Sequence, residues 1–500
     1  MPMTHMLAGV DLGSNSFRLA IGRVVYDDGV PQVYQVDRLK ETVRLAAGLD
    51  DDQVLDEATI ARAVAVLERF GERLRSFDPD RVRAVATNTF RVARNVEELH
   101  RRAEAALGFP IEVIAGREEA RLIFAGVAHS LPGSPERRFI VDIGGGSTEC
   151  IVGTGFEPEL MESLPMGCVS YSRRFFPDGR VDRDRMLRAE LAAREQVQGI
   201  ARTYRRLGWT AAYGSSGTAK ALAAILPATG LSEAGITREG LHRLRERLID
   251  AGSVDAAKLL DIKPDRAAVL PGGLAIMRAA FDELGIETMQ TADGALRVGV
   301  LYDLLGREAE QDKRAHTVRQ FMVRYEVDQA QAARVRASAL ALYRDVTDKS
   351  GQRADADEVA QLLGWAAELH ECGLSISHSS HHTHAAYILG HADMPGFSSS
   401  EQQLLATLCL GHYGKLTRPE FKILSPQHWL ALLCLRLGCL LCRRREDLPA
   451  PPLRAVLGKK QVHLQVQADW LAEHPLTDYS LRSEAEEWAK AGHKLTIDAQ

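Results

Sequence analysis

The sequence predicts an α/β protein with two similar halves around a shared cleft, followed by a mainly helical region. A short motif occurs twice, at residues 10–16 and 141–147, and each copy ends an apolar run with Asp before turning on Gly and Ser. A strand pattern resumes after each turn, so both copies are typical of a hairpin that joins two strands. The composition changes after Gly306, where the highly charged stretch 307–316 is typical of a linker.

Length and composition limit the class of protein. At 500 residues the chain exceeds a single core, and its 45% hydrophobic and 26% charged residues are ordinary for a globular protein. This composition excludes a disordered tail, a collagen, a coiled coil and a bundle of membrane helices. The net charge of −5 argues against a protein that coats nucleic acid, so no nucleic-acid partner is expected.

Cysteine usage and hydropathy indicate a cytoplasmic protein. The seven cysteines are irregularly spaced, which favours a reduced intracellular chain. We expect no signal peptide and no membrane-spanning helix, since no run reaches about 18 apolar residues. The closest run, 429–442, precedes an arginine cluster at 443–445. A buried helix with a basic end is the favoured interpretation, and a peripheral membrane contact is the alternative.

The first half, residues 1–128, carries alternating helix and strand signals. The expected elements are a helix over 56–77, strands over 82–86 and 111–114, and a helix over 117–127. The last helix begins with Glu118 and Glu119, and acidic side chains suit the positive end of a helix dipole.

The second half, residues 129–306, starts near a Pro-rich loop at 131–135. Further Gly-containing turns follow at 213–218 and 270–273. The stretch 296–305 is expected to form a helix that closes this half.

Two more domains are predicted after the linker. A helical pattern covers residues 315–448. A Pro-rich loop at 449–452 and a strand over 462–466 indicate a small terminal domain at 449–500.

The repeated turns have the chemistry of an anion site. Backbone N–H groups in a Gly-rich turn form a concave pocket for anions, and Gly permits close approach. Asp11 and Asp142 precede the turns and would repel phosphate unless a cation bridges them, for which Mg²⁺ is the natural choice. The alternative, that these are only structural turns, is weakened by the matching Asp in both copies.

Six motifs, in this order, resemble the exopolyphosphatase/guanosine-pentaphosphate phosphohydrolase family of the sugar kinase–actin–heat-shock chaperone superfamily. They are DLGSNSF at 11–17, ATNTFRVARN at 86–95, GREEARLIFAGV at 116–127, DIGGGSTE at 142–149, GSSGT at 214–218 and DGALRVGVLYDLL at 293–305. The resemblance implies two ribonuclease-H-like (actin-type ATPase) halves around a cleft. It also implies a degenerate HD-like helical domain and a small C-terminal α+β domain.

The resemblance implies roles for individual residues. Glu119 matches the family's catalytic glutamate, which would orient a water, and Arg91 matches an arginine that grips phosphate. Asp142 is the expected Mg²⁺ ligand, supported by Glu149 and Asp11. One phosphate would be cradled by Gly144, Gly145, Gly146, Ser147 and Thr148, another by Gly13, Ser14, Asn15 and Ser16. Gly214, Ser215, Ser216 and Gly217 stand where superfamily kinases hold the nucleoside.

The function implied is an exopolyphosphatase that releases orthophosphate from the end of linear polyphosphate. The alternative is a guanosine pentaphosphate (pppGpp) 5′-phosphohydrolase, with a bifunctional enzyme also open. A sugar kinase and a non-catalytic nucleotide sensor are less favoured. The resemblance further implies Mg²⁺, with K⁺ as a second candidate ion, and a homodimer.

Seven of the sixteen histidines lie between His370 and His412. The pair His370-Glu371 stands where an HD metallohydrolase has His-Asp, so the resemblance is to a degenerate form. A structural or polyanion-binding role is therefore favoured over a working metal site.

Overall fold

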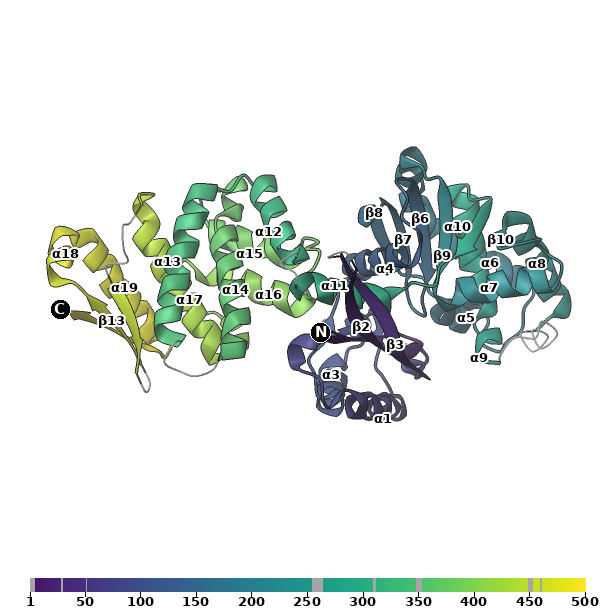
Figure 1. The fold of residues 1–500 in the computed structure, drawn as a ribbon, viewed down its shortest axis with the longest axis horizontal. Coiled ribbons are helices and arrows are strands. Elements are labelled where there is room, and N and C mark those ends of the chain that lie inside the picture. Colours follow the sequence, from purple (N-terminus) through teal and green to yellow (C-terminus); the bar gives the residue numbers. More distant parts are fainter. Residues whose placement is uncertain are drawn as a thin grey trace. The chain divides into compact units, whose positions relative to one another are not determined.

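The computed structural model describes residues 5–27, 30–50, 52–253, 264–308, 312–347, 353–447, 453–458 and 461–500. The chain divides into two compact units, Met1–Asp312 and Lys313–Gln500 (Figure 1). The division falls within the charged stretch 307–316. The predicted domain boundary at 449 and the loop 449–452 lie outside the described residues.

The first sheet has the strand order β3-β2-β1-β4-β5. Its strands are β1 His5–Leu12, β2 Ser16–Asp27, β3 Val30–Thr42, β4 Val82–Ala86 and β5 Ile111–Val113. Strands β1 to β3 are antiparallel neighbours, whereas β4 and β5 run parallel to β1. Helices α1 (Glu57–Leu74) and α3 (Val96–Leu107) pack their apolar stripes into this half through residues such as Phe70 and Leu99. The short helix α2 spans Asn88–Val92.

The second sheet repeats this order. Its strands are β6 Arg137–Ile143, β7 Thr148–Thr154, β8 Glu157–Leu164, β9 Ala211–Ser215, β10 Ile236–Thr237 and β11 Thr288–Thr291. In the order β8-β7-β6-β9-β11 the first three are antiparallel and the others parallel to β6, and β10 adds an edge. The helices are α5 Cys168–Phe175, α6 Arg183–Leu207, α7 Ser216–Ala228, α8 Arg238–Ala251, α9 Pro264–Ala267 and α10 Leu270–Leu284. The repeat confirms the two predicted ribonuclease-H-like halves.

The last helix of this unit, α11 (Leu296–Glu308), packs on the first sheet, against β1, β2 and β4. Its residues Leu301 and Leu304 share an apolar cluster with Leu7 of β1. The prediction that this helix closes the second half is therefore wrong, because an apolar stripe does not show which sheet will bury it. In turn α4 (Gly116–Ser130), from the first half of the sequence, packs against β7 and β8 and against α11.

The second unit is mainly helical, with a small sheet near its end. Its helices are α12 Lys313–Arg324, α13 Gln329–Thr347, α14 Arg353–Leu369, α15 His381–His391, α16 Ser399–Gly411, α17 Pro426–Leu441, α18 Ala468–Glu473 and α19 Pro475–Lys490. The sheet has the order β12-β13-β14, with β12 Leu453–Leu457, β13 Gln461–Val466 and β14 Lys494–Ala499.

The apolar stretch near residue 430 is a buried helix, as predicted. Leu432, Leu435 and Leu437 of α17 are wholly inaccessible to solvent and belong to the core of this unit. Within the described residues, no helix combines the length and the apolar character needed to span a bilayer.

Candidate active site

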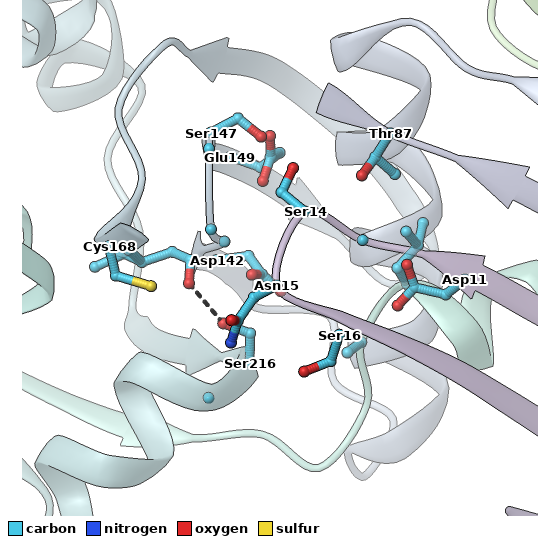
Figure 2. A pocket seen from close by; sticks show the side chains of 18 of the residues that line it. Asp11, Ser14, Asn15, Ser16, Thr87, Asp142, Ser147, Glu149, Cys168 and Ser216 are labelled. Carbon is cyan, nitrogen blue, oxygen red and sulfur yellow. Dashed lines mark hydrogen bonds between the residues drawn. The ribbon is translucent and has the colours of Figure 1, made fainter. Parts of the chain in front are cut away.

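The two Gly/Ser hairpins of the first unit meet beside a shared cavity. One turn joins β1 to β2 and the other joins β6 to β7, with Leu12 opposite Phe17 and Ile143 opposite Thr148. A Cβ atom on Gly145 would lie 3.2 Å from Cβ of Ser14, so the turns are in direct contact. Figure 2 shows Ser14 of the first turn near Ser147 of the second. The paired arrangement expected from the repeat is therefore present.

The second turn directs its carbonyl groups away from the cleft. The carbonyl oxygens of Gly144 and Gly145 accept hydrogen bonds of 2.9 to 3.1 Å from the start of α5. The donors are the N–H groups of Cys168, Val169 and Ser170. No hydrogen bond within the described part of the chain uses the N–H groups of Gly145 and Gly146. These donors are available to an anion.

The first turn is braced by its own half. The carbonyl oxygen of Asn15 accepts from the N–H groups of Val43 and Arg44, at 3.1 and 2.8 Å. The Thr89 hydroxyl donates to Oγ of Ser14 at 2.8 Å. Gly13, Ser14, Asn15 and Ser16 all line the cavity between the hairpins, as predicted.

Four carboxyl groups line the same cavity. They are Asp11, Glu119, Asp142 and Glu149, with exposures of 6%, 7%, 5% and 1%. Asp11 and Asp142 are equivalent, since each is the second-last residue of the strand that leads into its turn. Oδ1 of Asp11 is buried and has no hydrogen-bond partner among the described residues.

Burial makes these carboxyl groups weak acids. It raises the pKa of Asp11 to about 6 and that of Glu119 to about 7, and mutual repulsion with Asp142 adds to both. The pKa values of Asp142 and Glu149 are also raised by burial. A cavity that concentrates buried carboxylates in this way favours a bound cation.

Glu119 is held by an arginine. Nη1 of Arg91 donates to Oε2 of Glu119 at 2.9 Å and to the carbonyl oxygen of Ile114 at 2.9 Å. This ion pair lowers the pKa of Glu119, but burial outweighs it. Arg91 does not itself line the cavity and reaches it through Glu119.

Three predicted phosphate-binding residues do not reach the cavity. The Thr148 hydroxyl donates to the carbonyl oxygen of Met166 at 2.6 Å, and the Ser215 hydroxyl donates to that of Gly294 at 3.0 Å. Gly214 is packed against Met289. Thr148 begins β7 and Ser215 ends β9, and at these buried positions both hydroxyl groups bond within the fold.

Ser216 and Gly217 do line the cavity, together with Gly144, Gly145, Gly146 and Ser147. Ser216 adopts a φ of 65°, a left-handed conformation that is uncommon for a residue with a side chain. Its hydroxyl donates to the carbonyl oxygen of Ile143 at 2.9 Å, next to Asp142 (Figure 2). The third Gly/Ser turn thus braces the end of β6.

Sequence reasoning missed a set of basic residues beside the cavity. A second pocket shares Arg18, Arg266, Ser216 and Gly217 with the first. Its basic residues are Arg18, Lys40, Lys220, Arg266 and Arg297, and its one acidic residue is Asp293. Arg18 and Lys40 are paired across β2 and β3. Strand alternation could have placed Arg18 on the face opposite to Phe17 and Leu19. It could not predict that basic residues of α7, α9 and α11 lie beside Arg18.

The carboxyl groups fit a divalent cation without forming a closed cage. Among the described residues, no three His, Cys, Asp or Glu side chains are grouped closely enough to bind a metal by themselves. Mg²⁺ commonly uses one or two protein carboxylates and takes its remaining ligands from water and substrate phosphate. The unpartnered oxygen of Asp11 and the buried Asp142 fit that donor set.

The histidine cluster forms a separate cavity in the second unit. Nδ1 of His370 lies 2.7 Å from the carbonyl oxygen of Ala367, and Nδ1 of His412 lies 2.6 Å from that of Cys409, so both donate a proton. Nε2 of His412 lies 3.2 Å from Nε2 of His381. Burial lowers the pKa values of His370 and His412, which favours neutral rings.

Two family models together match most of this chain. The model of the Ppx/GppA phosphatase family matches residues 24–308, and that of Ppx/GppA phosphatase domain III matches residues 314–485. A Ppx/GppA family member from Aquifex aeolicus is 25% identical, with a TM-score of 0.51, over 61% of this chain and 99% of that chain. An exopolyphosphatase-like protein has the same identity and coverages and a TM-score of 0.54. An exopolyphosphatase from Cytophaga hutchinsonii shares the fold, at 24% identity and a TM-score of 0.52 over 61% of this chain and 98% of that chain.

Proposed function

Since the chain belongs to the Ppx/GppA phosphatase family, we propose that it is an exopolyphosphatase that releases orthophosphate from the end of linear polyphosphate. The observation that carries this proposal is the direct contact of the two hairpins above a cavity that also contains Glu119. Anion donors and a proton acceptor therefore meet at one place.

The terminal phosphate would bind the N–H groups of Gly145 and Gly146 and the hydroxyls of Ser14 and Ser147. Glu119 in its carboxylate form accepts a proton from a water molecule. The water oxygen forms a bond to the terminal phosphorus while the bond from that phosphorus to the bridging oxygen breaks. The bridging oxygen leaves as the new terminal oxygen of the shortened chain, and it takes up a proton from solvent as its acid–base equilibrium requires.

The remaining residues position these groups. Arg91 orients the carboxylate of Glu119 by its hydrogen bond at 2.9 Å. A bound Mg²⁺ would neutralise phosphate charge, and Asp142 would hold it with support from Asp11 and Glu149.

The basic pocket supports a polyanionic substrate. Five cationic side chains beside the cavity match the repeated negative charge of the phosphates beyond the terminal one. A guanosine pentaphosphate also carries several phosphates, so its 5′-phosphate is the alternative substrate of the same site.

The test is phosphate release from long-chain polyphosphate and from guanosine pentaphosphate, each with and without Mg²⁺. The proposal expects Mg²⁺-dependent release with the polymer as the better substrate by kcat/KM. A strong preference for the nucleotide would reverse the assignment of substrate. Release from neither substrate would overturn the proposed reaction.

A further inference from the structure

Six charged side chains pair with one another inside the first unit, where α4 and α11 meet the first sheet. They are Arg83, Glu112, Glu118, Arg121, Asp303 and Arg307. We call this set the ionic cluster. It contains three arginines and three acids, so its formal charges cancel.

Asp303 of α11 is the centre of the cluster. Its Oδ2 accepts from Nη1 of Arg83, on β4, at 2.5 Å and its Oδ1 accepts from Nη2 of Arg121, on α4. Arg307 adds a bond from Nε to Oδ2 at 3.3 Å. Although burial opposes it, the neighbouring Arg121, Arg83 and Arg307 lower the pKa of Asp303, which keeps it ionised.

Stability alone does not account for such a cluster. Removing charges from water is costly, and well-packed apolar residues often serve a fold equally well. The side chains of Arg83, Glu118 and Asp303 are 1%, 2% and 6% exposed, so this cost applies in full. A role in fixing one orientation of the surrounding elements explains why charges are used here.

The orientation that the cluster fixes is that of the first turn of α4. Glu118 receives two hydrogen bonds from Arg121, at 2.8 and 2.7 Å, and this pair faces Asp303. Glu119 follows directly and points into the substrate cavity, because adjacent helical residues lie on different faces. Holding the face of Glu118 therefore sets the rotation of the helix and the place of the Glu119 carboxylate.

Further along, α4 and α11 are in backbone contact. A Cβ atom on Gly299 would overlap the carbonyl oxygen of Leu122, and one on Gly126 would overlap that of Ala295. With α4 against β7 and β8 and α11 against β1, this crossing joins the two halves. The ionic cluster is the part of this junction nearest in sequence to Glu119.

We propose that Asp303 is a positioning residue, which holds Arg83 and Arg121 so that the first turn of α4 presents Glu119 to the terminal phosphate. This inference rests on the proposed function. It adds that proton transfer depends on a carboxylate that is not among the residues lining the substrate cavity.

The experiment compares D303N with E112Q in the full-length protein. Each substitution removes one negative charge from the ionic cluster, but Asp303 bonds Arg121 of α4 directly, whereas Glu112 bonds Arg83 of β4 and pairs with Arg307 of α11. We expect D303N to lower kcat about tenfold or more with KM changed less than about twofold, because small misplacements of a catalytic group are costly. E112Q should retain kcat within about twofold.

Thermal unfolding of each variant shows whether it is folded at the assay temperature. If D303N does not fold, E118Q removes the negative charge that Arg121 and Arg83 share at the first turn of α4 and leaves Asp303 in place. The same loss of kcat is expected. A folded D303N or E118Q with the kcat of the parent overturns the inference, as does an equal loss of kcat in E112Q. Absence of turnover in the parent itself would instead overturn the proposed function.

Discussion

Each compact unit has a cavity lined by buried titratable side chains. The two cavities differ in the kind of side chain and in whether its polar atoms have hydrogen-bond partners within the described residues. In the first unit the carboxyl groups of Asp11, Glu119 and Glu149 have raised pKa values, and one oxygen of Asp11 has no hydrogen-bond partner in the described part of the chain. In the second unit His370 and His412 donate to backbone carbonyl groups and have lowered pKa values. Buried anions need a proton or a cation, whereas neutral imidazoles bonded to the backbone need neither. The comparison favours the first unit as the place of the proposed chemistry.

The largest effect is expected from E119Q. The amide cannot accept the proton of the attacking water, so kcat should fall about 1,000-fold, within the usual range for a general base. Equilibrium binding of polyphosphate should stay close to that of the parent. H412Q, in the second cavity, is the matched control. If E119Q turned over substrate at the rate of the parent, Glu119 would not be the general base.

Removal of divalent cations is expected to lower phosphate release at least about 100-fold, because nothing then neutralises the carboxylates and the phosphates together. The measurement is release in excess EDTA, followed by addition of Mg²⁺ beyond the chelator. H412Q should show the same requirement for Mg²⁺. Undiminished release in EDTA would contradict the comparison between the two cavities.

A smaller effect is expected from R91Q. We expect kcat/KM to fall about tenfold, since Glu119 loses the donor that orients it.

The pH dependence of kcat/KM should also change in R91Q. Glu119 acts when deprotonated, so the parent's kcat/KM should rise with pH through about 7 and then level off. Because Arg91 lowers the pKa of Glu119, its loss should move that rise to higher pH. An unchanged profile would show that Arg91 does not act through Glu119.

Asp11 should show a pH-dependent effect on stability. Its pKa in the folded state is raised from 3.8 to about 6, so folding favours its protonated form, and this contribution is lost as pH rises through 6. Without divalent cations, D11N should therefore stabilise the protein at pH 8 but not at pH 4. The difference is about 3 kcal/mol, at about 1.36 kcal/mol per unit of pKa. The measurement is the free energy of unfolding by denaturant at pH 4 and at pH 8. An equal change in that free energy at both pH values would contradict the prediction.

The smallest effect on turnover is expected from H412Q, whose kcat should stay within about twofold of the parent. Stability should respond with the opposite sign to Asp11. Folding lowers the pKa of His412 below its ordinary value of 6.5. The folded state is therefore most stable at pH values above 6.5, and that stability is lost as the pH falls below 6.5. The parent should lose stability of the second unit on acidification, and H412Q should lose less. A tenfold loss of kcat in H412Q would break the comparison.

Local patterns in the sequence predicted much of this protein. The Asp and Gly/Ser repeat predicted both hairpins, since turn residues and strand alternation act over a few positions. The identity of Glu119, rather than Glu118, came from the resemblance, and helical spacing put the two on different faces. The helical character of residues 315–448 was likewise predicted from the period of its apolar residues.

Only the tertiary structure decided which distant segments meet. Nothing local distinguishes Arg18 and Arg297, which line the basic pocket, from other arginines, because that pocket combines residues of β2, β3, α7, α9 and α11. The same holds for Thr148, which bonds within the fold instead of facing the cavity. The raised pKa of Glu119 is also a tertiary property, since it arises from burial that no neighbour in the sequence provides. Turn and strand signals act over a few neighbouring residues. The assembly of the basic pocket, the burial of Glu119 and the packing of α11 depend instead on contacts between residues far apart in the chain.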